Sequence, residues 1–189
     1  MLERFSKSYS VINKEKFVEK LINFSVDQDY FILLNSNNNS DKYDLLCGYG
    51  VKSFIKSSEN SLTKLDNFFE FKKDWLFGYM TYDLRNEIEV LNDDNIDFIN
   101  MPNLYFFQPE IVWFVKGKIV TGLSFEKDLI DNDWKKFNEI SEKEKTENSS
   151  IVKLNLRNSK SEYINKVNKI KERIFRGDCY EMNFCFDLF

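Results

Sequence analysis

Pairs of carboxylates are the side chains in this sequence that most readily suggest metal chemistry. Glu87 and Glu89 lie two positions apart, and Asp93 and Asp94 are adjacent. Carboxylate oxygens bind hard cations such as Mg²⁺, but a site needs several ligands that converge on one point. Both pairs fall in the acidic segment 86–100, whose weak patterning is typical of a surface loop. We therefore interpret them as solvated carboxylates and predict no metal site among them.

Other common catalytic side chains are missing or unsuitably spaced. The sequence contains no histidine, which excludes Ser-His-Asp, Cys-His and histidine-metal sites within these 189 residues. Cys47, Cys179 and Cys185 form an odd set without CxxC spacing. That pattern favours reduced thiols over disulfides or a zinc site.

The composition predicts a folded protein and excludes two classes of partner. Hydrophobic residues make up 42% and aromatic residues 16%, too many for a chain that stays disordered. The net charge is -4 and no long basic block is present, so we expect no nucleic-acid partner. No apolar leader or run of membrane-helix length occurs, so we expect no membrane association and a cytoplasmic location.

The first half of the chain shows alternating helical and strand patterns. The expected elements are a helix over residues 14–25, strands over 30–34 and 43–47, a helix from about residue 61, and a buried strand over 75–82. A polar loop, 35–41, separates the first two strands. Gly78, inside the last strand, indicates a bulge or a close approach of another backbone.

The second half begins with β structure and ends with a strongly signalled helix. We expect a strand from Leu104, a hairpin of 110–115 and 118–123 around a Lys-Gly turn, then a charged helix and linker up to residue 150. A further strand is possible over 151–156. The spacing of Ser159 and Glu162 predicts a capping box, and Gly177 predicts the end of a helix over about 160–176.

Residues 180–188 alternate between apolar and polar side chains, as in a strand with one buried face. The sequence stops within this pattern. We therefore expect the chain to be the N-terminal part of a longer protein.

Three stretches resemble the large subunits of aminodeoxychorismate synthase (para-aminobenzoate synthase component I) and anthranilate synthase. They are LLNS at 33–36, FGYMTYD at 77–83 and GDCYEMN at 177–183. The last is the most specific, because the chorismate-binding domain of this family opens with a helix ending in Gly-Asp and a Tyr-Gln-hydrophobic-Asn strand. Glu181 replaces the usual Gln, whereas Asp178, Tyr180 and Asn183 match. Cys179 and Asn183 favour the aminodeoxychorismate branch.

The resemblance implies an α+β fold of large antiparallel sheets packed as a β-sandwich with helices outside. Residues 1–150 would form the N-terminal domain with a charged linker at its end, and 151–189 the truncated start of the chorismate-binding domain. The catalytic residues of the family would then lie downstream, and this segment alone would be inactive.

The resemblance also implies a reaction and its partners. The enzyme would use Mg²⁺ to replace the C4 hydroxyl of chorismate with ammonia, giving 4-amino-4-deoxychorismate for para-aminobenzoate and folate synthesis. This makes it a transferase, with ammonia supplied by a glutamine amidotransferase subunit. The ligands for Mg²⁺ are expected downstream of this segment.

The LLxS stretch resembles the tryptophan pocket of the family. Ser36 is the residue carried over, and by position Ser40, Asp41, Lys42 and Tyr43 would complete the pocket for L-tryptophan. A hydroxyl and loop backbone groups can bind the charged ends of an amino acid while aromatic rings bury an indole. The alternative is an ordinary polar turn between two strands.

Other functions stay open on the sequence alone. Anthranilate synthase is the nearest competing enzyme, and isochorismate or salicylate synthases are more distant ones. A stand-alone amino-acid-binding module without activity is a third hypothesis. An unrelated α+β interaction domain, with biased composition, is a fourth.

Overall fold

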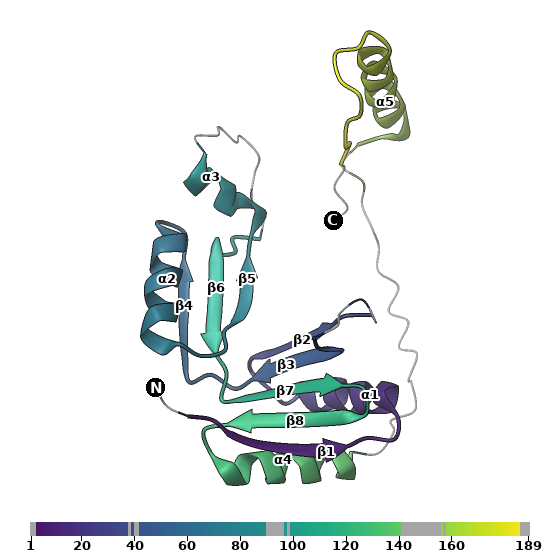
Figure 1. The fold of residues 1–189 in the computed structure, drawn as a ribbon. Coiled ribbons are helices and arrows are strands. Elements are labelled where there is room, and N and C mark those ends of the chain that lie inside the picture. Colours follow the sequence, from purple (N-terminus) through teal and green to yellow (C-terminus); the bar gives the residue numbers. More distant parts are fainter. Residues whose placement is uncertain are drawn as a thin grey trace. The chain divides into compact units, whose positions relative to one another are not determined.

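The computed structural model describes residues 3–37, 39, 42–89, 97, 99–140, 156 and 158–185. The chain divides into two compact units, Met1–Lys143 and Glu144–Phe189, which we describe separately (Figure 1). The predicted domain boundary at residue 150 stays a prediction.

The first unit combines antiparallel strands with helices, which confirms the expected α+β class. Its elements are β1 (Phe5–Ser10), α1 (Lys14–Ser25), β2 (Phe31–Asn35), β3 (Leu45–Tyr49), β4 (Ser53–Ser57), α2 (Ser61–Lys72), β5 (Phe77–Met80), the 3-10 turn η1 (Tyr82–Leu84), α3 (Arg85–Ile88), β6 (Leu104–Gln108), β7 (Ile111–Lys116), β8 (Ile119–Ser124) and α4 (Lys127–Glu139).

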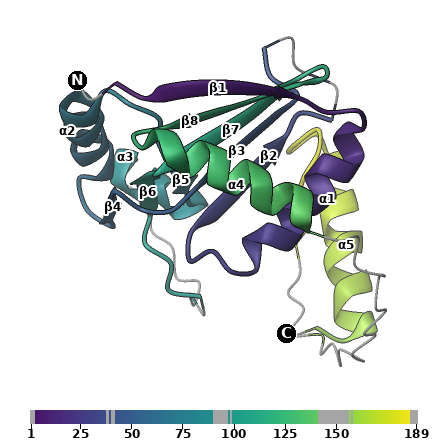
Figure 2. The ribbon, with the colours of Figure 1, turned by 90° about the horizontal axis from the view of Figure 1, so that it is seen from below.

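The strands form a large and a small sheet. The large sheet has the order β1-β8-β7-β3-β2, and the small sheet has the order β4-β6-β5. The predicted hairpin is confirmed as β7 and β8, with Lys116 paired to Ile119 across a two-residue turn. Gly117 has φ +58° in that turn, a conformation that glycine adopts without steric cost. The strands of the small sheet run at a steep angle to those of the large sheet (Figures 1 and 2).

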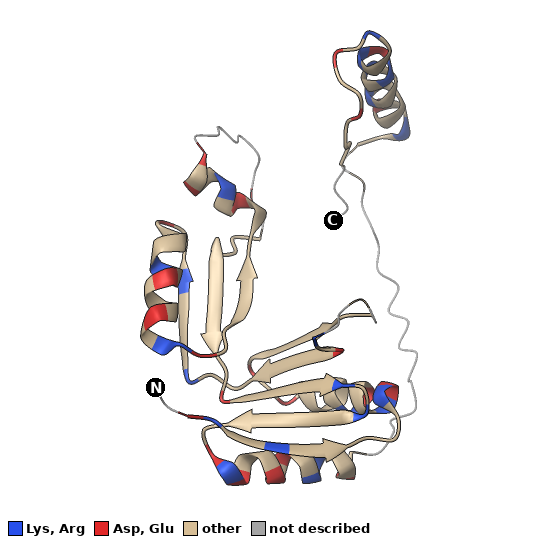
Figure 3. Cartoon of the chain, viewed as in Figure 1, with Lys and Arg blue, Asp and Glu red and all other residues tan. Residues whose placement is uncertain are grey.

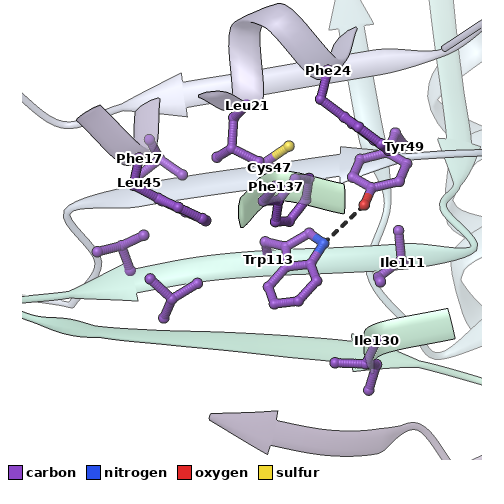
Figure 4. Close-up of a cluster of buried hydrophobic side chains, with 12 residues drawn as sticks. Phe17, Leu21, Phe24, Leu45, Cys47, Tyr49, Ile111, Trp113, Ile130 and Phe137 are labelled. Atoms are coloured by element: carbon purple, nitrogen blue, oxygen red, sulfur yellow. Dashed lines mark hydrogen bonds between the residues drawn. The ribbon is translucent and has the colours of Figure 1, made fainter. Parts of the chain in front are cut away.

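One hydrophobic core lies between the large sheet and two helices. Figure 2 shows α1 and α4 lying across the same face of this sheet. The apolar stripe predicted for α1 is confirmed, because Phe17, Leu21 and Phe24 are all buried in this core. Trp113 of β7 is fully buried at its centre and donates a hydrogen bond to Tyr49 at 3.0 Å (Figure 4).

A second core lies between the two sheets. Phe77 and Phe107 of the small sheet pack with Val112, which points from the large sheet away from the helices. Strand alternation explains the two faces, because Val112 lies between Ile111 and Trp113, which are both in the first core.

Arg4 joins the edges of both sheets. Its guanidinium donates two 2.8 Å hydrogen bonds to Asp74, just before β5, and a 2.6 Å bond to the carbonyl of Pro109, between β6 and β7. The Arg4 and Asp74 side chains are only 6% and 11% exposed. A bidentate pair with additional hydrogen bonds can offset the desolvation of both charges.

Several local expectations need correction. β1 and β4 were not predicted, because their sequences are largely polar and show no apolar alternation. The strand expected to reach Tyr82 ends at Met80, and residues 82–84 form η1. The surface loop was expected to start at residue 86, but residues 85–88 form the short helix α3. This segment is held in place because the Glu87 side chain accepts two hydrogen bonds from Ser61 at the start of α2.

The second unit contains α5 (Lys160–Phe175). Both arms of the predicted capping box are present, between Ser159 and Glu162, and Gly177 follows the helix at φ +80°. The strand expected over 180–188 is wrong for residues 181–185, which have no regular secondary structure. No neighbouring strand in the described part of the chain supplies the hydrogen bonds that a strand requires. The possible strand at 151–156 falls outside the described residues, except for Leu156.

Charged residues lie mainly on the helices, and the strands carry few of them (Figure 3). Within the described ranges, no helix is both long and apolar enough to cross a membrane.

Candidate functional site

Ser36 lies directly after β2, at the point where β2 and β3 diverge. Its backbone N–H donates a 3.0 Å hydrogen bond to the carbonyl of Asp44, which continues the β2–β3 ladder by one residue. Ile32 of β2 packs in the second core. Side chains along a strand point alternately to its two faces, so Ser36, four residues after Ile32, falls on the same face. Ser36 therefore belongs to the side of the large sheet that faces the small sheet.

The Ser36 hydroxyl is buried and has no hydrogen-bond partner within the described part of the chain. Leaving a buried polar group unsatisfied costs about 1 to 3 kcal/mol. An unsatisfied group of this kind calls for an explanation, and a ligand with a polar atom at this point would satisfy it.

Tyr43 provides an aromatic wall on the same side of the sheet. Its ring centroid lies 5.2 Å from that of Phe114 and 6.1 Å from that of Trp75. The ammonium of Lys42 lies 5.3 Å from the Tyr43 ring centroid. Trp75 continues the wall towards Phe77 of the second core, 6.4 Å away.

Asp44 fixes the end of the loop that carries these residues, and the sequence did not single it out. Its carboxylate accepts a 2.9 Å hydrogen bond from the backbone N–H of Gly117 and lies 3.7 Å from the Lys116 ammonium. A third contact reaches the Lys14 ammonium at 3.9 Å. Asp44 is thereby tied to the turn of the β7–β8 hairpin. The only sequence signal for this role of Asp44 was its position between the polar loop and the strand that follows it.

Three of the five residues expected in the tryptophan pocket belong to the described chain. Lys42 and Tyr43 lie together, and Ser36 is bonded to the residue next to Tyr43. Ser40 and Asp41 lie outside the described residues. The described groups can offer aromatic surface, a hydroxyl and an ammonium, which together suit an amino acid with an apolar side chain.

The carboxylate pairs have different surroundings. Glu87 accepts hydrogen bonds from the backbone N–H and hydroxyl of Ser61 and from the amide of Asn103, at 2.6 to 2.8 Å. Burial raises the pKa of Glu87, but these hydrogen bonds outweigh it and hold the pKa below its usual value. Asp93 and Asp94 lie outside the described residues. Across the described ranges, no three His, Cys, Asp or Glu side chains gather as a metal site.

The most specific stretch, 177–183, follows α5 in the second unit. Arg173 donates a 3.0 Å hydrogen bond to Asp178, which ties the end of the helix to this segment. Tyr180 is fully exposed and Met182 is about half exposed (52%). The apolar side chains of this stretch therefore have little packing within their own unit.

A comparison with protein families decides the relationship. The model of the chorismate binding enzyme family matches residues 23–189, which is most of the chain. The chain belongs to the chorismate-binding enzyme family. The resemblance drawn from the three stretches is confirmed at this level. No curated protein matches the chain.

The match to the chorismate-binding enzyme family begins within α1 and spans both units. It includes the loop between β2 and β3, residues 36–44, which we call the Ser36 loop. It also includes the stretch after α5. As a member of this family, the protein is related to enzymes that use chorismate.

Proposed function

We propose that the chain is part of aminodeoxychorismate synthase component I, which converts chorismate and ammonia to 4-amino-4-deoxychorismate. Membership of the chorismate-binding family carries the choice of substrate. Within the family, the GDCYEMN stretch with Cys179 and Asn183 favours this branch over anthranilate synthase. The product would serve para-aminobenzoate and folate synthesis.

The proposed reaction has a cofactor and a partner. Mg²⁺ would assist departure of the chorismate hydroxyl as a Lewis acid, and a glutamine amidotransferase subunit would supply ammonia. The described residues do not gather into an acidic site for this ion, so we assign no ligand among them and derive no step through it. A cytoplasmic location agrees with the free cysteines of the described chain.

An activity assay of the protein expressed from its full reading frame tests this proposal. It is incubated with chorismate, Mg²⁺ and an ammonium salt, and the products are separated by mass and fluorescence. We expect aminodeoxychorismate. Anthranilate would assign the protein to the tryptophan branch, and unchanged chorismate would favour a binding module without activity.

The Ser36 loop is proposed to bind L-tryptophan. Two observations support this assignment. The buried Ser36 hydroxyl has no hydrogen-bond partner among the described residues, and the rings of Tyr43, Phe114 and Trp75 lie side by side near it in the fold. The aromatic rings would contact the indole, and the hydroxyl would bond a charged end of the amino acid.

Substitution of Ser36 tests the pocket directly. We expect Ser36→Ala to weaken tryptophan binding about tenfold, because a hydrogen bond to a charged group contributes about 1.5 kcal/mol. The same substitution should not lower the free energy of unfolding of the ligand-free protein, because it removes an unsatisfied buried hydroxyl. Titration calorimetry and urea unfolding measure the two effects.

Ser6→Ala on the exposed strand β1 is the matched control and should leave the affinity unchanged. Equal tryptophan affinity in Ser36→Ala and the unsubstituted protein, or no tryptophan binding at all, would remove the pocket from the proposal. Neither result would affect the assay with chorismate.

A further inference from the structure

The strand β2 forms an unprotected edge of the large sheet. Among the described residues, no strand pairs with its outer side. Proteins usually protect sheet edges with charged side chains or proline, because unpaired N–H and C=O groups readily pair with another strand. Two other edge strands are protected in this way, since β1 carries Lys7 and β4 carries Lys56. The sequence of β2, Phe-Ile-Leu-Leu-Asn, contains neither a charge nor a proline.

The remaining edge strand, β5, is a poorer template for pairing. It has only four residues, and one of them is Gly78. Short edge strands and glycines in strands both weaken pairing with another chain. Of the edges in the described part of the chain, β2 is therefore the one most suited to accept a further strand.

The outer side of β2 presents the backbone groups of alternate residues. The Ser36 N–H donates a 3.0 Å hydrogen bond to the carbonyl of Asp44, and the Gly50 N–H donates a 3.2 Å bond to that of Tyr30. Even-numbered residues of this segment are therefore bonded to β3, and odd-numbered residues turn their N–H and C=O groups outward. These outward residues are Phe31, Leu33 and Asn35.

Apolar side chains border this edge on both faces of the sheet. Lys16 and Lys20 line the groove between α1 and α4, so they mark the flank of α1 that faces α4. Helical spacing places Val18 and Ile22 on the other flank, towards β2, because α4 packs on β1 and β8 at the far side of the sheet. Ile22 is 51% exposed, and Leu34, on the opposite face of the sheet, is 54% exposed.

We propose that β2 pairs antiparallel with β2 of a second copy of this chain, which joins two large sheets into one. The strand is self-complementary in one register. With Leu33 opposite Leu33 of the second copy, Phe31 lies opposite Asn35, and every outward residue meets another outward residue. No charged side chains oppose each other in this register. The two-fold axis keeps both α1 helices on one face, with their Ile22 flanks towards each other.

Sedimentation equilibrium on the 189-residue chain tests the proposal. We expect a concentration-dependent dimer of about 45 kDa, twice the chain mass of 22.7 kDa. Leu34→Lys should weaken dimerisation at least about tenfold, because it places a charge against apolar side chains of the second copy. Ile22→Lys, outside the strand, should weaken it as well. Thermal unfolding shows that each variant folds.

Ile119→Lys is the matched control, because Ile119 is also 54% exposed but lies on β8, which β1 and β7 flank on both sides. It should dimerise as the unsubstituted protein does. Neither the dimer nor its variants depend on the assay with chorismate, so failure of the proposed function would leave this proposal intact.

Amide hydrogen exchange locates the interface. The N–H groups of Phe31 and Leu33 should exchange more slowly at concentrations where the dimer predominates, whereas those of Ile32 and Leu34, bonded to β3, should be protected at every concentration. A monomer at every concentration would overturn the proposal. So would equal dimerisation of Leu34→Lys and Ile119→Lys, or a dimer in which protection of Leu33 does not change with concentration.

Discussion

Gly78 lies so close to the backbone of a neighbouring strand that no larger residue fits at this position. A Cβ atom there would lie 2.0 Å from the carbonyl oxygen of Tyr105 and 2.6 Å from the Cα of Phe106. Both atoms belong to the backbone of β6, the central strand of the small sheet, which cannot move aside without breaking its pairing with β5. The close approach expected at this glycine from the sequence is confirmed.

Gly78→Ala should therefore lower the free energy of unfolding by at least about 3 kcal/mol, at the upper end of overpacking costs. Gly117→Ala is the matched control, because a Cβ at Gly117 meets nothing within 4 Å and only its φ of +58° is unfavourable. We expect about 1 kcal/mol for the control. Urea unfolding measures both. Equal losses in the two variants would show that the β5–β6 contact is not the limiting feature.

At the scale of single elements, α2 depends on a side chain from another element. Its N-cap residue Asn60 has φ +51° and makes no side-chain cap. Glu87 of α3 takes that role, since its carboxylate accepts hydrogen bonds from the backbone N–H and the hydroxyl of Ser61. A carboxylate at this end of a helix also interacts favourably with the helix dipole.

Glu87→Gln should lower the free energy of unfolding by about 1 to 2 kcal/mol at neutral pH, because the substitution removes a charged acceptor from a helix N-terminus. The pKa of Glu87 is held below its usual value in the folded protein. Its contribution is therefore complete above the unfolded pKa and is lost as the pH falls through the folded pKa. The difference between the variant and the unsubstituted protein should shrink accordingly in acid.

Glu89→Gln, directly after α3, is the control and should change the free energy of unfolding by less than about 0.5 kcal/mol. Chemical unfolding at neutral and acidic pH provides both comparisons. An effect of Glu87→Gln that does not change with pH would argue against the carboxylate as the group that caps α2.

For the molecule as a whole, we expect two buried proton-bearing side chains of the first core to lower the free energy of unfolding in alkali. Cys47 is fully buried in the first core, and burial raises its pKa far above the ordinary thiol value of 9.0. Burial likewise raises the pKa of Tyr49, with a further contribution from the neighbouring Asp133 carboxylate, which accepts a 2.7 Å bond from its hydroxyl. In both cases the folded protein retains a proton that the unfolded chain loses.

The stability contributed by Cys47 is complete below pH 9 and is lost as the pH rises towards the folded pKa. Between pH 8 and pH 10 the unfolded thiol ionises while the folded one does not, which lowers the free energy of unfolding by about 1.4 kcal/mol. Over the same pH interval, we expect the free energy of unfolding of Cys47→Ala to fall by about 1.4 kcal/mol less than that of the unsubstituted protein. Urea unfolding at the two pH values measures the difference.

Cys179→Ala is the control, because Cys179 lies in the second unit and is partly exposed. It should show the same alkaline loss as the unsubstituted protein. An identical loss in Cys47→Ala would mean that the thiol is not the group responsible.

The sequence by itself determined the features that depend on neighbouring residues. The apolar spacing of α1, the Lys-Gly turn of the β7–β8 hairpin and the capping box of α5 each depend on contacts within a few positions. The stretches quoted from the sequence were also enough to indicate the family. Ser36 was singled out through the resemblance of the short motif after an apolar strand, and its role in a tryptophan pocket stays a prediction.

Only the tertiary structure decided what lies beside these local features. The polar strand β1 exists because β8 supplies its hydrogen bonds, and Glu87 is a cap because α3 packs near the start of α2. The 180–188 pattern alternates like a strand, yet residues 181–185 form none where no partner strand pairs with them. Backbone hydrogen bonds between strands and contacts between distant side chains depend on where the chain folds back, and alternation within one segment does not contain that information.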